Sequence, residues 1–232
     1  MKRIEFTEGD ALYDRAVRGF EILAGEAVRR RGRFLVALSG GSTPIPLYER
    51  LTRSRVVDWE SVHLFWSDER CVPSDDLASN YGATRSALLD RVPVPIEQIH
   101  RIEGEQPPLE AADAYEILAR GTLGEAGRFD LVLLGIGADG HVASLFPRHQ
   151  ALTETERWIL PVHVPAEPAW RITMTLPLIN AARNVQFLVV GREKANALYR
   201  IERGEDLPAV LVRPTDGEVT WLTDGEAGAL LG

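Results

Sequence analysis

Short runs of bulky apolar residues alternate with amphipathic segments along most of this chain, and that alternation limits the folds open to it. Continuous apolar runs are typical of strands buried on both faces, whereas apolar residues spaced three or four apart predict helices with one buried face. Strands and helices that alternate in this way build mostly parallel sheets. The sequence therefore predicts an α/β fold with helices on both faces of a mostly parallel sheet.

The bounds of these elements follow from their start and stop signals. Asp10 is expected to cap the first helix and Gly32 to end it, while Ser79 stands near the start of the third helix. The richest linker candidate, 103–110, is too short to separate two domains, so we expect a single domain over residues 1–232. Helices are expected at 10–31, 44–53, 79–89, 109–123 and 192–204, and strands at 33–39, 62–69, 98–102, 129–137, 158–164, 171–177, 185–191 and 219–224.

Composition excludes several classes of protein. Of the 232 residues, 45% are hydrophobic, which is enough for one substantial core. A formal charge of -8 disfavours a general nucleic-acid binder, which needs a basic face. The single cysteine, Cys71, excludes a disulfide framework, and the histidines lack the spacing of a zinc site, so no metal is expected. With no apolar leader and no run of roughly 18 apolar residues, the chain is expected to be soluble and cytoplasmic, without membrane partners.

Three predicted strands end in unusual polar sequences, and ligands of open parallel sheets bind beyond the carboxyl ends of the strands. The first is LSGGSTP, at 38–44. Gly40 and Gly41 allow close approach, the backbone N–H groups and the following helix attract an anion, and Ser42 and Thr43 add donors. The same stretch would also suit a tight turn capped by Ser42 or Thr43. It matches neither nucleotide-binding glycine motif, so nucleotide binding is not indicated.

Cationic residues stand at further strand ends. In FWSDERCVP, at 65–73, Arg70 could hold a phosphate or carboxylate through two parallel hydrogen bonds. Alternatively, Asp68 caps a turn and Arg70 pairs with it at the surface. Arg171 precedes a β-rich run and Lys194 opens a helix, and for each of them plain solvation is the ordinary alternative. A lysine in the first turn of a helix opposes the helix dipole, however, which favours a function for Lys194.

The third strand end is FDLVLLGIGADGHVASLFP, at 129–147, where an acid and a histidine follow the most hydrophobic strand. Gly135, Gly137 and Gly140 give the backbone freedom to aim Asp139 and His141 outward. A histidine suits proton transfer near neutral pH, and an aspartate beside it can orient the ring or support its charged form. The alternative is a loop whose histidine only caps the next helix.

Five blocks occur in order over residues 35 to 200: LSGGSTP, WSDERCVP with SNYGATRSALL, GIGADGHVASLFP, RITMTLPLIN and VGREKANAL. Together they resemble the 6-phosphogluconolactonase family, within the wider family that includes glucosamine-6-phosphate deaminases. The resemblance implies a Rossmann-like sheet, a sugar-6-phosphate substrate, and neither a metal nor another cofactor. It also implies a hydrolase of carbohydrate metabolism, which converts 6-phospho-D-glucono-1,5-lactone to 6-phospho-D-gluconate in the oxidative pentose phosphate pathway.

For such a reaction we expect His141 to activate water and then protonate the leaving ring oxygen, with Asp139 as its orienting partner. The partner is a small sugar phosphate rather than a nucleic acid or a membrane, and the chain is expected to be a monomer or a weak homodimer. The residues expected to bind the substrate are Gly40, Gly41, Ser42, Thr43, Asp68, Arg70, Arg171 and Lys194.

Two other functions are weighed against this one. The deaminases carry a glutamate five residues after the histidine and commonly read Asp-Glu-Tyr in the second block, where this chain has Phe146 and Arg70. Both departures favour the lactonase; a smaller one, Val142 where lactonases often have threonine, is expected to matter little. A non-catalytic sugar-phosphate sensor is disfavoured because binding a phosphate needs neither Asp139 nor His141.

Overall fold

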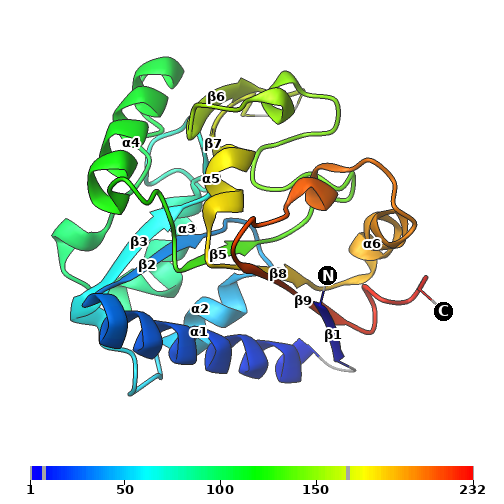
Figure 1. Ribbon diagram of the computed structural model, residues 1–232, viewed down its shortest axis with the longest axis horizontal. Coiled ribbons are helices and arrows are strands. Elements are labelled where there is room, and N and C mark those ends of the chain that lie inside the picture. Colours follow the sequence, from blue (N-terminus) through cyan, green and yellow to red (C-terminus); the bar gives the residue numbers. More distant parts are fainter. Residues whose placement is uncertain (1, 7–8, 166–167, 232) are drawn as a thin grey trace.

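A six-stranded parallel sheet forms the centre of the computed structural model, which describes residues 2–6, 9–165 and 168–231. Its strand order is β1-β9-β8-β5-β2-β3, and every neighbouring pair is parallel. Because all strands point the same way, their carboxyl ends gather at one edge (Figure 1). The strands are β1 (Lys2–Phe6), β2 (Phe34–Leu38), β3 (Val62–Trp66), β5 (Leu131–Leu134), β8 (Asn184–Val189) and β9 (Glu218–Asp224).

A second, smaller antiparallel sheet has the order β4-β7-β6 and was not expected. It consists of β4 (Asp68–Arg70), β6 (Ile159–His163) and β7 (Trp170–Met174). The strand predicted at 62–69 is therefore two strands, and Ser67 is the reason. Its N–H donates to the carbonyl of Leu38 in the large sheet, and its carbonyl accepts from Met174 in the small one, both at 2.8 Å. The chain changes sheets at this residue, so β4 presents its side chains to the edge where the large sheet ends.

Helices cover both faces of the large sheet. Figure 1 shows the long α1 along one face and α5 on the other, with α4 beside β6 and β7 of the small sheet. Helix α1 ends as predicted at Gly32, whose φ of 74° suits glycine. The Ser79 hydroxyl accepts the Gly82 N–H at 3.0 Å, which confirms it as the cap of α3. The helices are α1 (Gly9–Arg31), α2 (Ile45–Leu51), α3 (Asn80–Ala87), α4 (Pro108–Leu123), α5 (Leu176–Ala181) and α6 (Ala195–Glu202).

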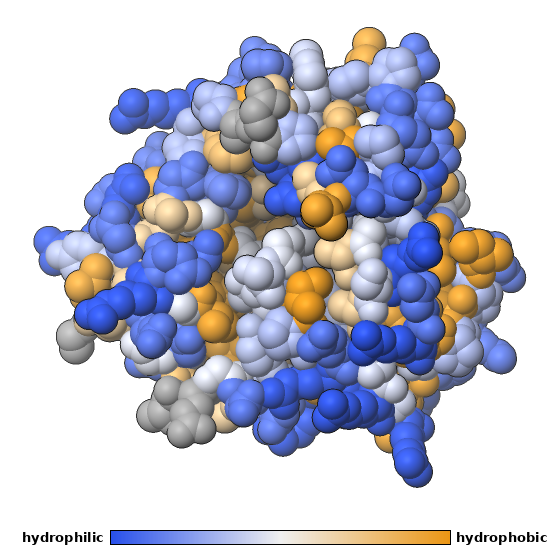
Figure 2. Space-filling model, turned by 180° about the vertical axis from the view of Figure 1, so that it is seen from behind, coloured by the Kyte–Doolittle hydropathy of each residue, from blue (hydrophilic) through white to orange (hydrophobic). Residues whose placement is uncertain are grey.

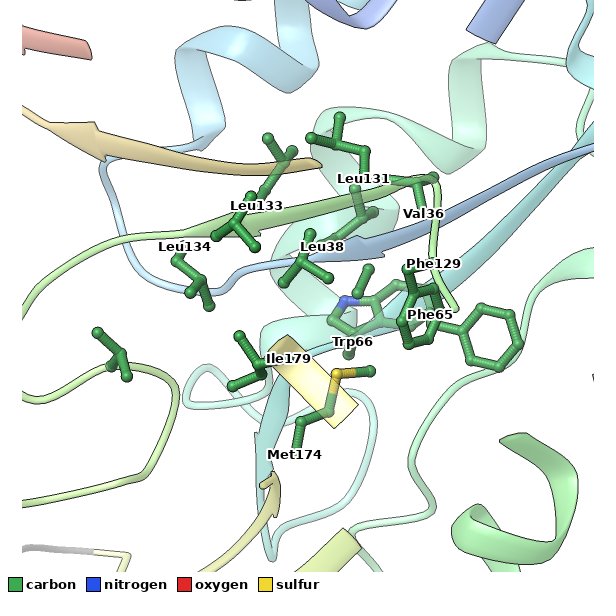
Figure 3. Packing of buried hydrophobic residues seen from close by; sticks show 14 of the residues in the cluster. Val36, Leu38, Phe65, Trp66, Phe129, Leu131, Leu133, Leu134, Met174 and Ile179 are labelled. Atoms are coloured by element: carbon green, nitrogen blue, oxygen red, sulfur yellow. The ribbon is translucent and has the colours of Figure 1, made fainter. Parts of the chain in front are cut away.

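The core lies between the two sheets and continues under α1. All residues of β2 and β5 are buried, as their continuous apolar runs predict. Figure 3 shows Trp66 packed between the strands and the side chains of Met174 and Ile179. The Trp66 indole N–H donates to Thr84 at 3.2 Å, so its buried polar atom is satisfied. This packing fixes the small sheet against the ends of β2 and β3.

Several expected elements differ from the structure. The strand expected at 98–102 is wrong: a 3₁₀ turn, Ile96–Gln98, is followed only by an isolated bridge from Ile99 to Leu64. Asp10 lies inside the first turn of α1 rather than at its cap, and pairs with Arg50 at 2.5 Å. The segment predicted as a helix at 192–204 begins as a 3₁₀ turn, Arg192–Lys194. Strand β1 and helix α5 were not predicted.

Figure 2 shows one face of the molecule, where hydrophilic residues predominate and hydrophobic residues occur in small groups. Among the described helices, none has the length and apolar character that crossing a bilayer requires.

Candidate active site

A pocket of about 420 Å³ opens at the carboxyl edge of the large sheet, where the small sheet meets it. This volume suits a small ligand such as a sugar phosphate. The loops after β2, β5 and β8 contribute to its wall, together with β4 and β7. Nine of the ten residues expected to form the site line it: Gly40, Gly41, Ser42, Thr43, Asp68, Arg70, His141, Arg171 and Lys194. The tenth, Asp139, contacts His141 from outside the lining.

The turn after β2 comes close to α3 and leaves its backbone donors free. A β-carbon on Gly40 would lie 1.8 Å from Oδ1 of Asn80, so only glycine allows this approach. Gly41 has a φ of 85°, which also favours glycine. Within the described residues, the N–H groups of Gly41, Ser42 and Thr43 have no backbone acceptor. These donors at the pocket wall are available to an anion. The seven-residue helix α2 begins two residues after this turn.

Arg70 and Arg171 lie directly opposite each other on β4 and β7. Nη1 of Arg70 donates to the Ala78 carbonyl at 2.6 Å, and Nε of Arg171 donates to the Pro168 carbonyl at 3.1 Å. These bonds hold the two like charges side by side. Burial, and then the charge of Arg70, lower the pKa of the Arg171 guanidinium. Two cations that are held together despite burial and mutual repulsion are typical of a site that binds a multiply charged anion.

Lys194, in the loop after β8, lines the same pocket, and we call Arg70, Arg171 and Lys194 together its cationic wall. Gly191, at the end of β8, has a φ of 97° and donates its N–H to the Asp224 carboxylate at 3.1 Å. That turn brings Lys194 to the pocket just before α6 begins. Among the described residues, the arginines that form ion pairs with carboxylates lie elsewhere, and none of Arg70, Arg171 and Lys194 is among them. The surface pair between Asp68 and Arg70, the alternative interpretation of this stretch, does not form among the described residues.

Glu69 faces away from the pocket because successive side chains of a strand alternate between its two sides. Its carboxylate accepts the N–H groups of Asn80 and Tyr81, at 2.7 and 2.8 Å, at the start of α3. Burial raises the pKa of Glu69, although these N–H donors act in the opposite direction. Glu69 therefore fixes α3 beside β4, and through α3 it places Asn80 at the pocket wall.

Asp68 connects the cationic side of the pocket to the histidine loop. Its Oδ2 accepts the Ser144 hydroxyl at 2.7 Å, and its Oδ1 accepts the Asn80 amide at 3.2 Å. The Ser144 N–H donates in turn to the Thr173 hydroxyl of β7 at 3.1 Å. All four side chains are buried. This network fixes the distance between the two halves of the pocket.

His141 and Asp139 form a hydrogen-bonded pair after β5. Nδ1 of His141 lies 2.6 Å from Oδ1 of Asp139, which also accepts the His141 backbone N–H at 3.1 Å. A carboxylate at Nδ1 selects the tautomer with the proton there, so Nε2 is the nitrogen left free. A β-carbon on Gly137 would lie 2.1 Å from Nδ1, which explains the glycine at that position. The imidazole is 30% exposed and lines the pocket, so it is accessible to a ligand.

The other candidate sites stay separate from this pocket. His63 and His100 contact each other at 3.1 Å beside Phe65, and burial lowers the pKa of both. Burial raises the pKa of the Cys71 thiol to about 11, so it carries no thiolate near neutral pH. No three His, Cys, Asp or Glu side chains of the described chain form a group that could hold a metal ion.

Sequence reasoning did not single out Ser144 as a site residue, and it gave Asn80 no distinct part. Asn80 and Ser144 are residue types common in loops and caps. Both stand in blocks that carry the resemblance, SNYGATRSALL and GIGADGHVASLFP, but nothing local marks either residue as part of a site. Their signal lies in the structure, where both contact the carboxylate of Asp68.

A histidine–aspartate pair lines or adjoins the same pocket as three cations, at the carboxyl edge of a parallel sheet. Such an arrangement is typical of enzymes that carry out acid–base chemistry on small anionic substrates. The comparison with family models agrees with that class. The chain belongs to the family described as glucosamine-6-phosphate isomerases/6-phosphogluconolactonase, whose model matches residues 7–221.

Individual relatives show which members of this family the chain is similar to. A 6-phosphogluconolactonase of Synechocystis is 45% identical over 212 residues, covering 88% of this chain and 87% of the relative. A probable chloroplastic 6-phosphogluconolactonase of rice is 39% identical over 228 residues, covering 90% of this chain and 69% of the relative. The crystal structure of a 6-phosphogluconolactonase from Thermotoga maritima matches with a TM-score of 0.86 at 30% identity, covering 96% of this chain and 99% of that one.

Proposed function

We propose that this protein hydrolyses 6-phospho-D-glucono-1,5-lactone to 6-phospho-D-gluconate in the oxidative pentose phosphate pathway. The relatives named 6-phosphogluconolactonase, in sequence and in structure, support this activity. The single observation that carries it for this chain is the pocket itself. An imidazole with one free nitrogen shares that pocket with three cations that lack carboxylate partners among the described residues.

The phosphate end of the substrate is assigned to Arg70, Arg171 and Lys194, with the free N–H groups of the turn at 40–43 as further donors. Charge-assisted hydrogen bonds from guanidinium groups are stronger than neutral ones. Because the phosphate does not react, its binding energy serves to hold the lactone carbon in place. The two neighbouring arginines are partly removed from water, so binding of a phosphate dianion between them is favoured over binding of water molecules.

The reaction end is assigned to His141. Its Nε2 accepts a proton from water as the water oxygen forms a bond to C1 of the lactone, which gives a tetrahedral intermediate with a negative oxygen. The intermediate collapses by breaking the bond between C1 and the ring oxygen, and the imidazolium returns the proton to that oxygen. Asp139 keeps Nδ1 protonated and stabilises the imidazolium. The product acid then ionises, and His141 is neutral again.

The residue beside His141 in the pocket disfavours the alternative function, that of a glucosamine-6-phosphate deaminase. Phe146 lies beside His141, with ring centroids 4.3 Å apart, and offers no group that can exchange a proton. One acid–base residue is enough for a lactone, whose carbonyl is already electrophilic.

A direct assay tests the proposal. We expect purified protein to consume the lactone faster than its spontaneous hydrolysis in a no-enzyme control, and to release no ammonia from glucosamine 6-phosphate. His141→Asn is expected to lower kcat by about 10²–10⁴-fold. His163→Asn, a matched change at an exposed histidine outside the pocket, is expected to leave kcat unchanged. Thermal stabilisation by 6-phosphogluconate without any turnover would instead indicate a non-catalytic sensor.

The remaining expectations belong to this proposal. We propose that residues 1–232 act as one domain, since the two sheets share a core and both contribute to the pocket. A cytoplasmic location and a monomeric or weakly dimeric state stay predictions from the sequence. Size-exclusion chromatography with light scattering tests the oligomeric state.

A further inference from the structure

The ring of Phe146 lies over the face of the His141 imidazole. The two ring centroids are 4.3 Å apart and the planes meet at 28°, so the rings are stacked. Phe146 is half-buried, packs against the hydrophobic core and lines the pocket. His141 is thus held at one edge by Asp139 and covered on one face by an aromatic ring.

The backbone between these two residues is built to make the contact. Residues 142–145 form a tight turn in which the Leu145 N–H donates to the Val142 carbonyl at 2.8 Å, and both side chains are fully buried. Ala143 at the tip has a φ of 47°, a conformation that costs free energy in a residue other than glycine. Ser144 is held by Asp68 and by Thr173. The turn therefore keeps a strained residue and is anchored by hydrogen bonds to Asp68 and Thr173. It reverses the direction of the chain, so that Phe146 contacts the imidazole of His141.

A single hydrogen bond at Nδ1 leaves the imidazole one freedom, since the ring can tilt about the bond to Asp139 and carry Nε2 away from the substrate carbon. The Phe146 face removes that freedom. The backbone at Gly137 also lies close to the ring, because a β-carbon there would lie 2.1 Å from Nδ1. Three contacts therefore confine the imidazole: the ring of Phe146, the carboxylate of Asp139 and the backbone at Gly137.

We infer that Phe146 is a positioning residue for the hydrolysis, which aims Nε2 of His141 at the lactone carbon through the stacked contact. The inference rests on the proposed function and deepens it. A flat aromatic ring meets the requirement and a branched aliphatic side chain of similar bulk does not, because only the flat ring matches the plane of the imidazole. Phe146 acts on the direction of the proton transfer, whereas the cationic wall is responsible for capturing the substrate.

The test replaces the flat ring and keeps its bulk. Phe146→Leu is expected to lower kcat by about 10–100-fold, the effect of misaligning a catalytic group by around 1 Å, and to change KM by less than about twofold. Phe146→Tyr, which restores a flat ring, is expected to return kcat to within about threefold of the wild type. Trp170→Leu is the matched control: it removes an exposed ring that meets His163 edge-on outside the pocket, and is expected to leave both constants unchanged.

A second measurement does not depend on turnover. In proton NMR spectra the carbon-bound protons of the His141 ring are expected to be shifted upfield by the Phe146 ring current, and to lose that shift in Phe146→Leu but keep it in Phe146→Tyr. An unchanged kcat in Phe146→Leu, or a raised KM with an unchanged kcat, would overturn the inference, the latter because it would make Phe146 a substrate contact. Absence of lactone hydrolysis in the wild type would refute the proposed function instead, and the NMR result would still show whether the two rings are stacked in solution, without which Phe146 cannot orient the imidazole.

Discussion

Replacing Gly137 by alanine tests the account of the histidine loop with the smallest possible change. The added β-carbon would lie 2.1 Å from Nδ1 of His141 and 2.6 Å from Oδ1 of Asp139. Carbon and nitrogen atoms in contact stand about 3.5 Å apart, so the imidazole, the carboxylate or both must move by about 1–1.5 Å. Gly137 is not among the described residues with a positive φ, so alanine fits its backbone, and the three nearest atoms that the β-carbon would meet all belong to these two side chains.

The expected consequence is a loss of rate without a loss of capture. A displacement of around 1 Å costs about 10²-fold, and the whole acid–base contribution is about 10²–10⁴-fold. We therefore expect Gly137→Ala to lower kcat by about 10²–10³-fold, which corresponds to about 3–4 kcal/mol in the activation free energy. KM is expected to stay within about threefold, because the cationic wall is untouched.

Steady-state kinetics on the lactone, corrected for spontaneous hydrolysis, measures both constants. Gly25→Ala is the matched control, because nothing lies within 4 Å of the added β-carbon in α1. It is expected to keep full activity and to raise the free energy of unfolding by about 0.5–1 kcal/mol, the difference in helix propensity. A kcat of Gly137→Ala within about threefold of the wild type would show that the tight fit around His141 has no part in catalysis.

Two further predictions concern the cations and the buried histidines. Lys194→Ala is expected to raise KM by about 10–100-fold with little change in kcat, since it removes one charged hydrogen bond to the phosphate. Arg192→Ala, an exposed change in the same turn, is the control. An equal effect of the two variants on KM would contradict the assignment of Lys194 to the phosphate. Burial lowers the pKa of His100 from 6.5 to about 4. Between these two pH values the unfolded chain binds a proton at His100 that the native chain does not bind. The free energy of unfolding therefore falls as the pH drops from 6.5 towards 4. His100→Gln is expected to remove about 1–2 kcal/mol of that fall, a figure discounted for partial exposure, in urea unfolding at pH 7 and pH 5. His163→Gln serves as the control, and an unchanged pH slope in His100→Gln would show that this burial does not affect stability.

The positions of the candidate residues could be predicted because they depend on local patterns. Apart from Arg171, which stands at the start of its strand, each lies within a few residues of the end of a buried apolar run, and the ends of parallel strands meet at one edge of a sheet. His141, Arg70, Lys194 and the turn at 40–43 reach one pocket for that reason. The roles assigned to them stay predictions until the variants are measured.

The second sheet could not be predicted from the same patterns. The run at 62–69 reads as one strand because nothing in its residues marks the change of partner at Ser67. That change depends on hydrogen bonds to Leu38 and Met174, which are distant in the sequence. Ser144 was not predicted, and only the family resemblance placed the Asn80 region at the pocket, for a related reason. Both residues matter because they share the Asp68 carboxylate, a contact that only the folded chain creates.

The central claim is that one pocket holds the phosphate at its cationic wall and presents C1 of the sugar acid to His141. A crystal structure with 6-phospho-D-gluconate bound tests that claim most directly. The account predicts phosphate oxygens on Arg70, Arg171 and Lys194, and the C1 carboxylate within about 3 Å of Nε2 of His141. A phosphate bound away from those three cations, or a C1 carboxylate turned away from His141, would contradict it.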